Sequence, residues 1–191
     1  MISEFNGINM FKELDEELEK FMQDYKLIKE MDEITSSTKL ETDYNEYYNP
    51  NVGNMGTYFG KRITSGVGKR SVDKGSKYHY GLDLAYNNEP VYAFCSGKVV
   101  FAGNMLGFGR LVMIQDSNNY FHAYAHLNTI NIKVGQIVKK DDLLGKSGTS
   151  YFDGKVLKDN YFAPHLHYSI WKNFKGRESE QAIDPRMYKY P

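Results

Sequence analysis

Apolar residues recur with a helical period near the start of the chain and with shorter, strand-like periods after it. In the early stretch they are separated by three and four positions, at Phe11, Leu14, Leu18, Phe21, Tyr25 and Ile28. These spacings place all the side chains along one face of an α-helix, with the heptad character of a coiled-coil seam. We therefore predict an amphipathic helix from Met10 to Met31, within an N-terminal segment of residues 1–35. The seam either packs against the same chain or serves attachment and oligomerisation.

A polar stretch follows this segment, and a different pattern begins after it. Residues 36–57 hold few aliphatic side chains and include the turn formers Asn49, Pro50 and Gly53, which is typical of a linker. Beyond it, short aromatic and β-branched runs such as "HYGLDLAY", "PVYAFCSGKVVFAG" and "HLHYSIW" are separated by glycine turns. This pattern predicts strands, with no second helical period of comparable length. We expect a mainly β fold, with an antiparallel β-sheet domain over residues 58–191.

Composition narrows the class of protein. The 191 residues, 41% of them hydrophobic, can bury one core. The 24 basic and 24 acidic residues balance, so we expect no nucleic-acid partner. The single cysteine, Cys95, excludes an intrachain disulfide and a cysteine-based zinc site, and we expect it to be a buried strand residue. No apolar run approaches the roughly 18 residues of a membrane span, and the first residues lack the apolar core of a signal peptide.

The five histidines lie in segments that offer polar groups on alternate positions. Residues two apart in a strand point to the same face, so His165 and His167 face one place. His79 and Asp83 are four apart and would also share a face of a strand. Imidazole and carboxylate are good zinc ligands, and three ligands with a fourth position open to water are typical of a catalytic site. The spacing alone leaves open which of the four stays free of the metal.

A third segment, "HAYAHL", places His122, Tyr124 and His126 on alternate positions. By strand alternation these three side chains share one face. For His122 we expect a solvated or core position.

Taken in order, these motifs resemble the lysostaphin-type zinc metallopeptidases that cut peptidoglycan peptides. The resemblance runs from about Arg62 to Tyr188, through "RITSGVGKR", "HYGLDLAYNNEPVYAFCSGKVVFAG", "YAHL", "VGQIVKKDDLLGKSG", "APHLHYSIW" and "IDPRMY". His-x-x-x-Asp and His-x-His in this order, with Tyr-Ala-His-Leu between them, form a highly specific combination. The resemblance implies a groove-shaped zinc site in the β-sheet domain.

The resemblance also implies a role for each motif residue. His79, Asp83 and His167 would hold one zinc ion per chain, while His126 and His165 would be metal-free catalytic histidines. Zinc lowers the pKa of water toward about 7 and polarises the scissile carbonyl. The two catalytic histidines would assist proton transfer and stabilise the oxyanion. Tyr124 could donate a hydrogen bond to substrate, although a packed strand tyrosine is the alternative.

The chain departs from the family pattern at "SYFDGKVLKDNYF", residues 150–162, where a short glycine- and serine-rich turn is common. Asp153-Gly154 is a hairpin signal, so we expect an extra hairpin beside the cleft that affects substrate selection. Asp141 stands where glycine is frequent, which indicates a different turn.

The resemblance predicts a zinc endopeptidase that cleaves bacterial peptidoglycan, in a glycine-containing cross-bridge or in the stem peptide. We expect a phage tail component, located in the virion, whose other partners are virion proteins or a second copy bound through the N-terminal helix. The alternatives are a lysis-stage endolysin, or a structural or wall-binding component that keeps the peptidase fold.

Overall fold

The computed structural model describes residues 55–71, 76–173 and 181–191. The chain divides into two units, residues 1–41 and 42–191, and all described residues belong to the second. The predicted helix of Met10–Met31 and most of the predicted linker lie outside the described residues. Within the described part, no helix is long and apolar enough to cross a membrane.

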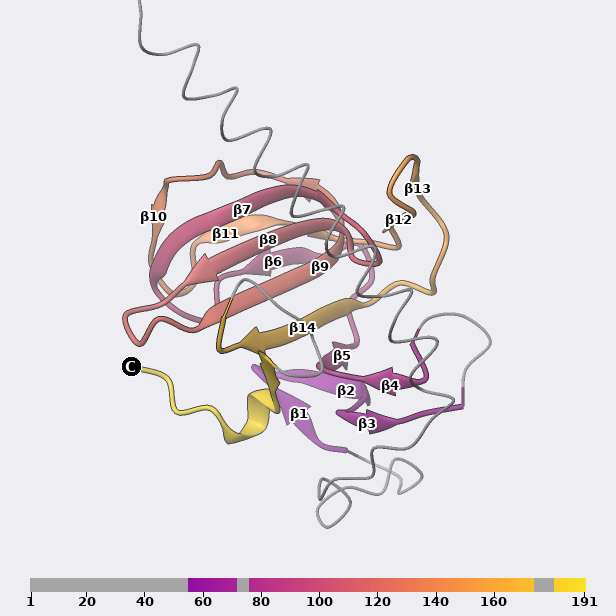
Figure 1. Ribbon diagram of the computed structural model, residues 1–191, viewed down its shortest axis with the longest axis horizontal. Helices are drawn as coiled ribbons and strands as arrows, with labels where there is room; N and C mark the ends of the chain where they lie inside the picture. Colours follow the sequence, from indigo (N-terminus) through magenta and orange to yellow (C-terminus); the bar gives the residue numbers. More distant parts are fainter. Residues whose placement is uncertain (1–54, 72–75, 174–180) are drawn as a thin grey trace, which may run out of the picture. The chain divides into compact units, whose positions relative to one another are not determined.

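The described residues are mainly β-strand, as the sequence predicts (Figure 1). The strands are β1 (Thr57–Tyr58), β2 (Lys61–Ser65), β3 (Gly68–Lys69), β4 (Tyr78–His79), β5 (Leu82–Leu84), β6 (Pro90–Tyr92), β7 (Gly97–Met105), β8 (Gly109–Gln115), β9 (Phe121–Ile130), β10 (Ile137–Val138), β11 (Leu143–Ser147), β12 (Tyr151–Phe152), β13 (Leu157–Lys158), β14 (Leu166–Trp171) and β15 (Ala182–Ile183). One short 3-10 helix, η1 (Pro185–Met187), precedes the C-terminal residues. Because β1 includes Thr57, the sheet begins one residue before the predicted domain boundary.

One antiparallel sheet holds most of these strands, in the order β1-β2-β5-β14-β9-β8-β7-β10. β11 pairs with both β6 and β9, and β15 pairs with β14. Figure 1 shows β7, β8, β9 and β14 side by side in the body of the sheet, with β1 to β5 beyond β14. The place of β14 between β5 and β9 brings chain segments far apart in sequence into register, with His167 opposite Asp83 on one side and Ala125 on the other.

The core consists of apolar side chains from the central strands. Every residue of β14 is buried, so this strand is covered on both faces and carries apolar and polar side chains alike. Phe94 packs edge to face against Tyr124 and Tyr168 in the core, with ring centroids 5.3 and 4.8 Å apart, and the two tyrosine rings are tilted to each other at 5.1 Å. Cys95 is buried as predicted, but it lies in the bend between β6 and β7 and not in a strand.

The segment around His79 and Asp83 is not one continuous strand. β4 ends at His79 and β5 begins at Leu82, with Tyr80 and Gly81 between them outside any strand. β4 pairs with β3 in a separate ribbon, whereas β5 belongs to the main sheet. The prediction that alternation within one strand places the two side chains on one face is therefore wrong. They meet because the chain passes from one sheet to the other between them.

Alternation also fails within β9, because the strand contains an irregularity. The pairing register of β8 with β9 shifts between Arg110 and Val112, and His126 has a positive φ of 59°. An extra residue in one strand reverses which face the following side chains occupy. Tyr124 consequently packs in the core while His126 points into the site, so the prediction that they share a face is wrong.

The predicted extra hairpin is confirmed. β12 pairs with β13 antiparallel, Tyr151 opposite Lys158, and the pair projects from the sheet in Figure 1. The Asp153 carboxylate accepts hydrogen bonds from the backbone N–H groups of Lys155 and Val156, which closes the turn. The Arg110 guanidinium on β8 donates to both oxygens of Asp159, at 2.6 and 3.3 Å, and so ties the hairpin base to the sheet.

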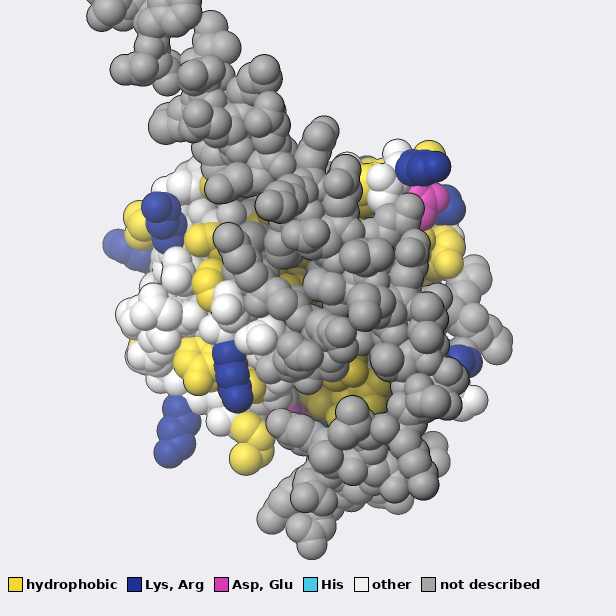
Figure 2. Space-filling model, in the orientation of Figure 1, with side chains coloured by type: hydrophobic (Ala, Val, Ile, Leu, Met, Phe, Trp, Pro, Cys, Tyr) yellow, Lys and Arg dark blue, Asp and Glu magenta, His cyan; other side chains and the backbone are white. Residues whose placement is uncertain are grey.

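Charged side chains are dispersed on the visible part of the described surface. On the face seen in Figure 2, Lys and Arg side chains are scattered and do not form one patch, and the β12–β13 hairpin carries both signs. This distribution matches the balanced composition of the chain.

Candidate metal centre

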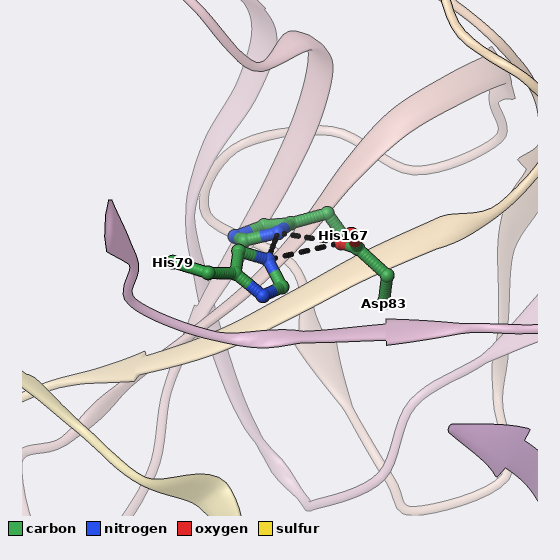
Figure 3. Close-up of side chains that lie close together, drawn as sticks. All are labelled: His79, Asp83 and His167. Carbon is green, nitrogen blue, oxygen red and sulfur yellow. Dashed lines mark hydrogen bonds and ion pairs between the residues drawn. The ribbon is translucent and has the colours of Figure 1, made fainter. Parts of the chain in front are cut away.

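Three side chains from three strands converge on one point. His79 lies at the end of β4, Asp83 in β5 and His167 in β14. His79 Nε2 is 2.9 Å from His167 Nδ1 and 3.0 Å from Asp83 Oδ1, and the last two atoms are 3.1 Å apart (Figure 3). The three atoms form a nearly equilateral triangle of two nitrogens and one oxygen, which is a donor set that zinc prefers.

Hydrogen bonds behind the triangle leave lone pairs facing one another. His79 Nδ1 lies 2.8 Å from the carbonyl oxygen of Gly66 and donates its proton there, so a neutral ring presents a lone pair at Nε2. That lone pair faces Asp83 Oδ1, which is also an acceptor. Two acceptors at hydrogen-bond distance without a proton between them are stabilised by a cation, so these residues fit a metal ion.

The protonation states of the ligands agree with this interpretation. Burial raises the pKa of the Asp83 carboxyl, but His79 and His167 outweigh it and the net pKa is well below the usual value. Burial lowers the pKa of His167 to about 4. At neutral pH Asp83 is therefore anionic and His167 neutral, which are the forms in which these side chains bind zinc. The His167 Nε2 atom is buried without a hydrogen-bond partner, and Nδ1 is the nitrogen that faces the other two ligands.

His126 and His165 lie beside the triangle, with His165 Nε2 3.7 Å from Asp83 Oδ1. Their ring centroids are 4.8 Å apart, and the His126 centroid is 5.9 Å from that of His167. His126 Nδ1 donates to the carbonyl oxygen of Ser150 at 2.8 Å, and His165 Nδ1 to that of Ala163 at 2.7 Å. In its neutral form, each ring therefore presents an unprotonated Nε2. Burial, with the neighbouring His165 and His167, lowers the pKa of His126 well below its usual range.

Sequence reasoning missed an aromatic cluster beside these two histidines. The Phe162 ring centroid is 4.7 Å from His126 and 5.9 Å from His165. Tyr161 stacks on Tyr151 at 4.2 Å, and both rings contact Phe162 edge to face. The hairpin segment therefore presents aromatic surface next to His126 and His165. The aromatic residues flanking the Asp-Gly turn were the available signal.

The structure places Tyr124 and His122 in the core and not in the site. Tyr124 is fully buried and its hydroxyl accepts a hydrogen bond from Phe94 N–H at 2.8 Å, so the tentative substrate contact is wrong. His122 is buried as well, with Nε2 3.0 Å from Asp116 Oδ2 and Nδ1 2.6 Å from the Tyr168 hydroxyl. Of the two alternatives for His122, the core position is the one observed.

Comparisons with known proteins agree with this geometry. The family model described as peptidase family M23 matches residues 77–185. The L-Ala–D-Glu endopeptidase of Bacillus subtilis is 38% identical over 125 residues, which are 63% of this chain and 35% of that protein. Among solved structures, lysostaphin from Staphylococcus simulans matches with a TM-score of 0.57 and 31% identity, over 66% of this chain and 49% of that one. A zinc-containing peptidase from Vibrio cholerae matches with a TM-score of 0.53 and 27% identity, over 69% of this chain and 37% of that one.

Proposed function

We propose, since the chain belongs to peptidase family M23, that it is an endopeptidase that cleaves peptide bonds in bacterial cell-wall peptidoglycan. Family M23 consists of zinc metallopeptidases, and zinc is the cofactor. The chain spans 35% of the length of its Bacillus subtilis relative, so the activity of the whole protein is inferred from the site. The observation that carries the proposal is that His165 Nε2 lies 3.7 Å from Asp83 Oδ1 of the ligand triangle, with the His126 ring next to it.

The metal would be held by His79 Nε2, Asp83 Oδ1 and His167 Nδ1. When bound there, zinc polarises the scissile carbonyl and lowers the pKa of a water molecule toward about 7. Substrate would approach the metal beside His126 and His165, which lie next to the three ligands.

His126 and His165 move protons. Each holds its Nδ1 proton on a backbone carbonyl, so each Nε2 can accept a proton from the attacking water and return one to the leaving amine. The ring that accepts this proton then carries positive charge beside the oxyanion and stabilises it until the proton passes to the leaving amine. The low pKa of His126 keeps its ring neutral, and thus able to act as a base, at neutral pH.

Two classes of peptide bond are supported as substrates. A Staphylococcus capitis relative, 34% identical over 110 residues, is named a glycyl-glycine endopeptidase, which supports a glycine-containing cross-bridge. The Bacillus subtilis relative is named for the L-Ala–D-Glu bond, which supports the stem peptide. Mass spectrometry of fragments released from purified walls of several bacteria distinguishes the two, since each cleavage leaves a different new N-terminus. Release of glycan fragments without any new peptide terminus would contradict the proposal.

The role of the N-terminal segment is a separate part of the proposal. We propose that the seam from Phe11 to Ile28 attaches the domain to a larger assembly, and that a phage tail delivers it to the host wall. The support is the sequence pattern of that segment, which lies outside the described residues.

The site predicts two classes of variant. His79→Ala, Asp83→Ala and His167→Ala should each lose zinc, because two remaining ligands anchor the metal too weakly. His126→Ala and His165→Ala should keep zinc and lose turnover by about 10²-fold or more, since proton transfer is removed. Metal analysis beside a wall-lysis assay measures both. Full zinc in His167→Ala together with zinc loss in His165→Ala would reverse the assignment of the pair.

A further inference from the structure

The two oxygens of the Asp83 carboxylate have different surroundings. Oδ1 faces the ligand triangle, 3.0 Å from His79 Nε2 and 3.1 Å from His167 Nδ1. Oδ2 faces away from it and lies 3.1 Å from Nη1 of Arg70. We propose that Arg70 is a positioning residue of the metal centre, which holds Oδ2 so that Asp83 offers zinc one oxygen only. The inference rests on zinc binding here and is independent of the wall substrate.

The Arg70 guanidinium is itself held in place. Its Nε donates to the carbonyl oxygen of Ser76 at 3.0 Å, and its backbone N–H donates to that of Lys77 at 2.9 Å. Nη1, which donates to Asp83, also lies 3.4 Å from the Ser65 hydroxyl. With 21% of its side chain exposed, the guanidinium is mostly shielded from water that would compete for these bonds.

Ser65 connects this arrangement to a second ligand. Its hydroxyl oxygen is 3.2 Å from His79 Nδ1, the nitrogen that also donates to Gly66. Ser65 pairs with Asp83 across β2 and β5 at an irregular register. Arg70 therefore contacts Asp83 directly and His79 through Ser65, so it is placed to orient two of the three ligands.

The fixed orientation has a chemical consequence. A carboxylate with both oxygens free can bind a metal through one or both, and a second oxygen would take up space that substrate needs. Outer hydrogen bonds of this kind commonly orient metal ligands, and their loss weakens binding. Arginine suits the role because it stays protonated at all relevant pH values and presents several donors in a rigid fork.

Charge and position predict opposite effects, which makes the inference testable. A positive guanidinium repels a bound cation close to it. If Arg70 acted only through its charge, it would weaken zinc binding, and its removal would tighten binding. If Arg70 positions Asp83, its removal should loosen binding instead. We expect Arg70→Gln to raise the Kd for zinc about 10- to 100-fold, with Arg70→Lys between Arg70→Gln and the unchanged protein.

Competition with a chelator of known affinity measures the zinc Kd in the full chain. Lys69→Gln is the matched control, because it removes the same charge from an exposed neighbouring side chain and should leave the Kd unchanged. Asp83→Asn supplies the second arm of a double-mutant cycle. If Arg70 acts through Asp83, Arg70→Gln should weaken zinc binding less in the Asp83→Asn protein than in the otherwise unchanged protein.

Cobalt substitution reports the coordination itself. The visible absorption of Co²⁺ should be weaker in Arg70→Gln than in the unchanged protein, because a second carboxylate oxygen raises the coordination number. An unchanged or tighter zinc Kd in both Arg70→Gln and Arg70→Lys would overturn the inference, as would effects that simply add to those of Asp83→Asn. Thermal melts of the metal-free variants identify a fold defect. If Arg70→Gln does not fold, the zinc Kd and the Co²⁺ absorption of Arg70→Lys test the inference in its place.

Discussion

At the scale of single residues, Gly81 matters because a side chain there would collide with His167, one of the proposed metal ligands. A Cβ at this position would lie 2.6 Å from the Tyr168 carbonyl oxygen and 2.8 Å from His167 Cε1. No real Cβ contact is that short, so Gly81→Ala should displace β14 or the His167 ring. We expect a loss of about 1 to 3 kcal/mol in the free energy of unfolding, together with weaker zinc binding.

Gly103→Ala is the control for this prediction, since its added Cβ would meet the Phe101 ring at an ordinary 3.6 Å. Denaturant melts and zinc titration compare the two variants. A Gly81→Ala protein that matches Gly103→Ala in both measurements would show that the strands adjust without cost.

His122 makes stability depend on pH. Burial lowers its pKa, although Asp116 acts in the opposite direction, so below about pH 6.5 the unfolded chain binds a proton that the folded chain does not. Folding is then penalised as the pH falls, by at most about 1.4 kcal/mol per pH unit for this one group. His122→Gln keeps a donor for Asp116 and removes the titration.

His122→Gln should be less stable than the unchanged protein at pH 7.5, because the hydrogen bond between His122 Nδ1 and the Tyr168 hydroxyl is lost. The difference in unfolding free energy should narrow toward pH 5. Denaturant melts of the zinc-free proteins across this range measure it. A difference that stays constant with pH would mean that His122 does not titrate on unfolding.

At the scale of elements, the β12–β13 hairpin should select substrate without taking part in chemistry. Its aromatic base contacts His126 and His165, whereas its tip is exposed. Replacing residues 152–160 by a short glycine and serine turn keeps Ser150, whose carbonyl orients His126, and Phe162. We expect a changed panel of cleaved peptides or a changed KM, with zinc content unaltered.

Val156→Ser tests the same hairpin at its exposed tip and should leave the kinetics unchanged. Kinetics on a set of cross-bridge and stem peptides compare the two variants. If the shortened protein cuts the same set with unchanged constants, the hairpin is only surface structure.

At the scale of the whole molecule, the predicted helix of Met10–Met31 should attach the protein and not assist catalysis. Burying its six seam side chains contributes about 1.5 to 3 kcal/mol each before entropy is subtracted. Leu14→Glu with Leu18→Glu should therefore abolish self-association or incorporation into an assembly. Hydrolysis of a soluble peptide should continue, because the ligands and both catalytic histidines lie at residue 79 and beyond.

Light scattering and a peptide-cleavage assay test the double variant, and Gln23→Glu on the predicted polar face is its control. Loss of cleavage or unfolding of the double variant would place the helix in the peptidase core, and would make the predicted domain boundary wrong.

The sequence by itself determined the composition of the site. Two motifs offered His79, Asp83, His165 and His167 as candidates, because each motif carries them at a short spacing within one local segment, and the family resemblance added His126 from a third. The mainly β class and the extra hairpin followed for the same reason: alternation and an Asp-Gly turn are local properties of the chain.

Only the tertiary structure decided how these residues meet. The faces of Tyr124 and His126 depend on a register shift against β8, and the alignment of His79 with Asp83 depends on a break between two sheets. The contact of Arg70 with Asp83 spans 13 positions, and the pairing of His122 with Asp116 depends on which side chains the core covers. Such features arise from hydrogen bonds and packing between distant segments, and a local pattern of polar and apolar residues does not specify them.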